Sequence, residues 1–164
     1  MKRAKPLLYI IFFLISVLSF PPQSYAAEYK ILKTKHAKIH YNQDKDLGDF
    51  IWRISGKRIN QPADFSLAKS AVDRIIERVQ SILDMFPDNF HIAIFLHPTY
   101  KDGDIALYKH KARALDVYVD RVTDGVLAHE IAHAIINSYF DVPPPKKVQE
   151  ILSQYVDRHL WSDY

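Results

Sequence analysis

The sequence has 164 residues, of which 48% are hydrophobic and 25% are charged. This length suits one ordinary domain, and the composition is typical of a globular protein and excludes a disordered or fibrous chain. Cysteine is absent, which excludes disulfide bonds, iron–sulfur clusters, thiolate zinc sites and a cysteine nucleophile. The formal charge of +3 would suit a nucleic-acid partner, so the position of the charges matters.

The first 26 residues have the features of a secretory signal peptide. A basic start (Lys2–Lys5) precedes an uncharged apolar run from Leu7 to Phe20, and a small-x-small pattern follows at Ser24–Ala26. We expect cleavage after Ala26 or Ala27. The alternative is a retained membrane anchor, but the apolar run is shorter than the roughly 20 residues that a spanning helix needs.

Removal of residues 1–26 changes the charge of the chain. Three of the 22 basic residues and none of the 19 acidic residues lie in this segment, so residues 27–164 hold 22 − 3 = 19 basic and 19 acidic residues. The positive charge therefore belongs to the export signal, and we expect no nucleic-acid partner. The sequence predicts an exported protein, periplasmic or secreted, with one domain over residues 27–164 and no stable membrane span after signal removal.

The patterns along this domain predict alternating strands and helices. Alternation indicates a strand at His36–Tyr41 and a turn at Asn42–Lys45, whereas residues 46–65 show no clear pattern. Apolar residues at spacings of three and four predict a helix from Ser66 to Phe86. The other expected elements are strands at 91–97, 105–109 and 114–119 and helices at about 125–139 and 146–160. This order predicts an α+β fold.

The expected helix over residues 125–139 contains the motif His129-Glu130-Ile131-Ala132-His133. Histidines four residues apart project from one helix face, so both imidazoles can bind one metal ion. Glu130 points to the side of this pair, where its carboxylate can contact a water at the ion without binding the ion itself. Random order would produce this pattern in about one of a hundred such chains. The motif therefore predicts a metal site.

A catalytic zinc site needs three protein ligands and one open position, so a third ligand must lie outside the motif. Glu150 follows His133 by seventeen residues, in the first turn of the final expected helix. A proline-rich corner at Pro143–Pro145 would fold this helix back and bring Glu150 to the histidines. Asp157 is the other acidic residue near this helix. The sequence thus predicts that Zn²⁺ binds to the two histidines and Glu150, and Asp157 is the alternative for the third ligand.

The motif His129–His133, followed by Glu150 on the next helix, resembles the gluzincin zinc metallopeptidases of the thermolysin-like clan, especially their small peptidase MA-like domains. The resemblance extends loosely from His36 to Tyr155. It implies a zincin-like domain with a small mixed sheet, a long backing helix, an active-site helix and a C-terminal glutamate helix. It also implies that Glu130 is the catalytic base and that an edge strand, here Ala114–Val119, pairs with an extended substrate.

Three classes of function follow from these expectations. The first is an exported zinc metallopeptidase, a hydrolase that cleaves peptide or protein substrates with a zinc-activated water and Glu130 as general base. The second is a catalytically inactive zinc-binding interaction domain of the same fold, because Ile151 replaces the glycine that gluzincins often have after the third ligand. The third is a metal-free periplasmic binding domain. For the peptidase, the candidate oxyanion donors are Arg113, Tyr139, Tyr155 and His159.

Overall fold

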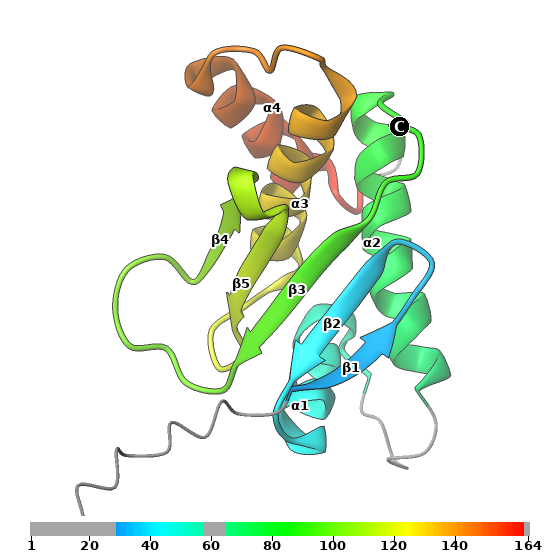
Figure 1. The fold of residues 1–164 in the computed structure, drawn as a ribbon, viewed down its shortest axis with the longest axis vertical. Coiled ribbons are helices and arrows are strands. Elements are labelled where there is room, and N and C mark those ends of the chain that lie inside the picture. The colour runs from blue at the N-terminus through cyan, green and yellow to red at the C-terminus, as the bar shows by residue number, and fades with distance from the viewer. Residues whose placement is uncertain (1–28, 58–64, 163–164) are drawn as a thin grey trace, which may run out of the picture.

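The computed structural model describes residues 29–57 and 65–162, and the predicted signal peptide at residues 1–26 lies outside the described residues. Four α-helices and a five-stranded mixed sheet form an α+β fold over the described part, as predicted (Figure 1). None of these helices is long and apolar enough to cross a membrane. The elements in chain order are β1 (Lys30–Lys33), β2 (Ala37–Tyr41), α1 (Asp44–Ser55), α2 (Ser66–Leu83), β3 (Ile92–His97), β4 (Ala106–Lys109), the 3₁₀ turn η1 (His110–Ala112), β5 (Ala114–Tyr118), α3 (Asp124–Tyr139) and α4 (Lys146–His159).

The sheet has the strand order β1-β2-β3-β5-β4. Strands β2, β3 and β5 are parallel, and β1 and β4 pair antiparallel at the two edges. Ile39, Ile94 and Leu115 lie in register across the three central strands and are fully buried. Helices α1, α2 and α3 pack on this face of the sheet, so the hydrophobic core lies between the sheet and these helices (Figure 1).

Two elements are absent from the sequence-based expectation. Strand β1 forms an antiparallel pair with β2, and α1 begins at Asp44, so the expected turn over Asn42–Lys45 is wrong in its second half. The backbone N–H of Gln43 donates to the Asp46 carboxylate at 3.2 Å and starts the helix. The apolar residues of α1 have helical spacing and are at most 1% exposed: Leu47, Phe50, Ile51 and Ile54. Burial of this face stabilises α1. The helical spacing of these apolar residues therefore predicts the local structure better than the turn-forming residues at 42–45 do.

The free edge of the sheet beside α3 belongs to β4, and the expectation that Ala114–Val119 is an edge strand is wrong. This segment forms β5, which lies between β3 and β4. The chain reverses from β4 to β5 through η1, where Arg113 adopts a left-handed backbone conformation with φ of 47°. The hydrophobic pattern of a strand reports how its faces are buried and carries no information about which neighbours it pairs with.

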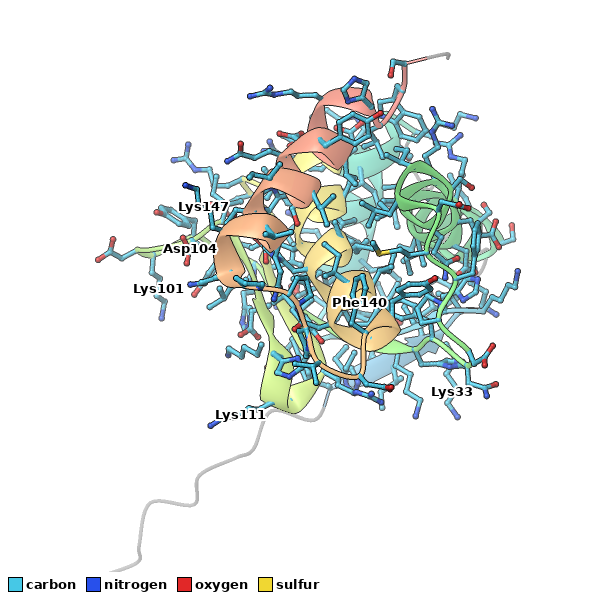
Figure 2. All side chains as sticks on the ribbon, turned by 90° about the horizontal axis from the view of Figure 1, so that it is seen from above. Lys33, Lys101, Asp104, Lys111, Phe140 and Lys147 are labelled. Atoms are coloured by element: carbon cyan, nitrogen blue, oxygen red, sulfur yellow. The ribbon has the colours of Figure 1, made fainter. Side chains whose placement is uncertain are left out.

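Helix α3 lies between the sheet and α4. Its first turn is capped by Thr123, whose hydroxyl accepts the N–H of Val126 at 3.3 Å. Figure 2 shows α4 lying over α3 when the molecule is seen from above, with Phe140 after the end of α3 and Lys147 at the start of α4. The residues that seat α4 on the core are Ser153, Val156 and Leu160, each at most 2% exposed. The proline-rich corner thus folds α4 back on α3, as expected.

Candidate metal centre

Helix α3 presents three polar side chains along one line at a four-residue spacing: His129, His133 and Asn137. All three line one cavity, whereas most of the remaining α3 side chains are apolar and buried in the core. The ring centroids of the two histidines are 5.0 Å apart. Their side chains are only 22% and 13% exposed, so packing limits how far the imidazoles can turn. Helical periodicity therefore brings both imidazoles to the same part of the cavity, as the motif predicts.

Helix α4 brings Glu150 to these histidines. One carboxylate oxygen lies 3.5 Å from Nε2 of His129, and the other lies 3.5 Å from Nε2 of His133. One ligand atom from each of the three residues lies within 4.8 Å of the other two. The three residues that the sequence predicts as ligands thus form a group that is close enough to hold a metal ion.

The spacing of these atoms suits a small tetrahedral site. Two ligand atoms bound to zinc at about 2.0–2.1 Å in tetrahedral geometry lie about 3.4 Å apart. Nε2 of His129 lies 3.5 Å from Oε2 of Glu150 and Nε2 of His133 lies 3.5 Å from Oε1, so each distance joins a different carboxylate oxygen, and one ligand atom from each residue lies within 4.8 Å of the other two. Two imidazole nitrogens and one carboxylate oxygen also match the donor set of hydrolytic zinc sites with one open position. The residues present therefore fit a zinc ion, although imidazole also suits other divalent transition metals.

Asp157, the other candidate for the third ligand, lies elsewhere. Its carboxylate packs against Gly125 at the start of α3, where a Cβ atom added to the glycine would be 2.3 Å from Oδ1. Gly125 lies one helical turn before His129, on the side away from His133. Asp157 is not part of the group that could hold an ion. The structure therefore favours Glu150 over Asp157.

Glu130 lies between α3 and the free edge of β4. Its Oε2 accepts the backbone N–H of Tyr108 at 2.8 Å. Along an antiparallel pair of strands, residues that hydrogen-bond to the partner strand alternate with residues whose backbone groups point away from it. The N–H of Tyr118 on β5 donates to the carbonyl of Ile105, three residues before Tyr108. Tyr108 therefore directs its backbone groups away from β5 and toward α3. Burial raises the pKa of the Glu130 carboxyl above its ordinary value, and the N–H of Tyr108 partly opposes this shift. The contact fixes one side of the Glu130 carboxylate.

These residues surround a cavity of about 550 Å³ between β4, α3 and the start of α4. None of the four oxyanion donors expected from the sequence lines it. Tyr155, for example, stacks on His159 with a centroid distance of 4.1 Å. The polar side chains that sequence reasoning missed are Asp104, Tyr108, His110, Asn137, Lys146 and Gln149. Of these, Asn137 could have been predicted from the sequence, because it follows His133 by four residues and so lies on the same helix face.

No family model, curated protein or solved structure matches the chain. The resemblance to gluzincins therefore depends on the motif and on the arrangement of His129, His133, Glu130 and Glu150.

Proposed function

We propose that this protein is an exported zinc-dependent peptidase of the gluzincin type, with a zincin-like fold. The observation that carries the proposal is the convergence of His129, His133 and Glu150, from two helices, at distances that suit one zinc ion. Glu130, the candidate base, opens onto the same cavity. A metal centre, a carboxylate beside it and a free strand edge are together the parts that hydrolysis of an extended peptide needs.

The two histidines and Glu150 would hold the ion, and the remaining residues would bind the substrate and move protons. Zinc, when bound, supplies a water of lowered pKa and polarises the scissile carbonyl. Strand β4 offers the backbone groups of Ala106 and the carbonyl of Tyr108 at its free edge, where an extended substrate can add as a further strand. This pairing would place a peptide along the cavity beside α3.

Glu130 would act as the general base. Its Oε2 is held by the N–H of Tyr108, and no other described residue bonds its Oε1, so this oxygen is available to take a proton. General base catalysis needs a carboxylate within reach of the attacking water, and Glu130 lines the same cavity as the two histidines. Glu130 would then pass the proton to the nitrogen that leaves.

The proposal is tested by metal content and by cleavage of a denatured protein mixture. We expect about one zinc per chain, cleavage that a chelator stops, and restoration of cleavage by added zinc. The Glu130→Gln variant should keep its zinc and lose cleavage by at least about 100-fold, because general base catalysis contributes about that much or more. Zinc binding with unchanged cleavage in Glu130→Gln would refute its role as the base.

One observation favours a second function, a zinc-binding interaction domain without turnover. The Glu130 carboxylate joins α3 to β4 through the N–H of Tyr108, so it has a structural role even without catalysis. Ile151, at the position where gluzincins often have glycine, is 58% exposed beside Glu150, and an exposed apolar residue suits a contact with another protein. Stoichiometric zinc with no cleavage by the wild-type protein would favour this second function over the first.

A further inference from the structure

The side-chain amides of Asn137 and Gln149 join the two helices that carry the metal-binding residues. Nδ2 of Asn137 donates to the backbone carbonyl of His133 at 2.7 Å and to Oε1 of Gln149 at 2.8 Å. Nε2 of Gln149 in turn donates to the carbonyl of Pro144 at 2.9 Å, in the loop before α4. We call these two side chains the amide bridge.

The amide bridge lies directly beside the candidate ligands. Asn137 follows His133 by one helical turn, and Gln149 precedes Glu150 in the chain. Both amides line the same cavity as the ligands and are partly buried. The hydrogen bond between them therefore joins α3 to α4 next to one ligand on each helix.

The start of α4 has few other contacts that could fix its position. Its buried residues begin only at Ser153, one turn after Glu150. Val148 and Ile151 are 41% and 58% exposed, and the residue that precedes the helix, Pro145, gives no side-chain cap. Apolar packing thus holds the later turns of α4, whereas the amide bridge holds the turn that carries Glu150.

We propose that the amide bridge positions Glu150 against His129 and His133, so that Asn137 and Gln149 set the affinity of the metal site without touching the ion. The inference rests on the proposed metal binding. Its physical basis is preorganisation: a carboxylate that is already held near its bound position loses less conformational freedom when it binds. Both amides are neutral, so they can hold Glu150 without competing with the ion for its charge.

The test is the zinc affinity of the Gln149→Met variant, measured by competition with a chromophoric chelator. Methionine keeps the length of the side chain and removes both hydrogen bonds of Gln149. We expect the affinity to fall about 10- to 100-fold, the range found for residues that orient metal ligands. The matched control is Gln154→Met on the exposed side of the same helix, which should bind zinc as the wild-type protein does.

A second measurement separates positioning from general stabilisation. If the amide bridge acts through Glu150, Gln149→Met should lower the affinity no further when Glu150→Ala is already present. If circular dichroism shows that Gln149→Met does not fold, Asn137→Leu replaces it, because this variant removes the same hydrogen bond between Asn137 and Gln149. Its effect on the affinity should depend on Glu150 in the same way.

Three outcomes would overturn the inference. Affinity within twofold of the wild type in a folded bridge variant would show that the amides do not position the ligand. An equal loss of affinity with and without Glu150 would show that they act on the fold or on the histidines. If wild-type protein binds no zinc, the proposed function and this inference fall together, whereas the first two outcomes leave the proposed function standing.

Discussion

At the scale of single residues, the choice of the third candidate ligand depends on position along α4. Glu150 and Asp157 are seven residues apart, so helical periodicity places both on nearly the same face of α4. The same seven residues separate them by about 10.5 Å along the helix axis. One carboxylate therefore meets the histidines, and the other meets Gly125. The two acidic residues on this helix therefore have different surroundings, and the structure agrees with the sequence-based preference for Glu150.

The pair provides a matched test of the ligand set. Glu150→Ala should lower zinc affinity by more than about 100-fold, because it removes a ligand and residues that merely orient ligands change affinity 10- to 100-fold. Asp157→Ala removes the same charge from the same helix and should leave the affinity unchanged. Competition titrations on both variants measure the difference. An affinity that depends on Asp157 and not on Glu150 would contradict the assignment.

At the scale of the elements, an ionic cluster joins the strands beside the site. Asp116 on β5 lies 3.1 Å from Nε2 of His97 on β3 and also pairs with the ammonium group of Lys109 on β4. The three strands are neighbours in the sheet, so one carboxylate contacts both strands that flank its own. These hydrogen bonds hold the pKa of Asp116 below its ordinary value against the opposing effect of burial.

This lowered pKa predicts how stability depends on pH. A carboxyl whose pKa is lower when folded contributes stability above its unfolded pKa, near 3.9, and loses it as the pH falls through the folded value. Asp116→Asn should therefore lower the free energy of unfolding by about 1.5–3 kcal/mol at pH 7, the typical range for hydrogen bonds to a charged group. The difference from wild type should shrink below pH 4.

Urea unfolding at pH 7 and at successively lower pH measures this difference. Asp88→Asn is the control, because Asp88 is exposed and no described residue pairs with its side chain. A loss of stability in Asp116→Asn that stays the same down to pH 2 would show that the charge of Asp116 is not the cause.

At the scale of the whole molecule, the candidate ligands come from two helices that separate on unfolding. His129 and His133 lie on α3, and Glu150 lies on α4. An ion that binds all three residues favours the folded chain over the unfolded chain. Metal binding and global stability are therefore coupled.

This coupling predicts the effect of metal removal. At a free zinc concentration 100 times the Kd, the folded state should gain about 2.7 kcal/mol, which raises the Tm by roughly 10 °C for a domain of this size. Removal of zinc with a chelator should reverse the gain. Thermal unfolding by circular dichroism, with and without the chelator, measures it, and Glu150→Ala should show a much smaller shift. Equal Tm values for wild-type protein in both conditions would contradict a zinc site.

The sequence alone determined those features that depend on neighbours along the chain. Helical periodicity places His129, Glu130 and His133 relative to one another, because residues one turn apart share a face wherever the helix lies. The α+β class also follows from local patterns of period two and period 3.6. The helix α1 could have been found in the same way, since its buried residues have helical spacing.

Only the tertiary structure decided what depends on residues far apart in the sequence. The packing of α4 on α3 selects Glu150 over Asp157, since it sets the position of one helix along the other. Because β5 pairs with a strand on each side, β4 is the edge strand. The backbone N–H of Tyr108 on β4 is therefore free to donate to the Glu130 carboxylate. Such contacts form between surfaces whose relative position is set by the whole core, and no local pattern records that position.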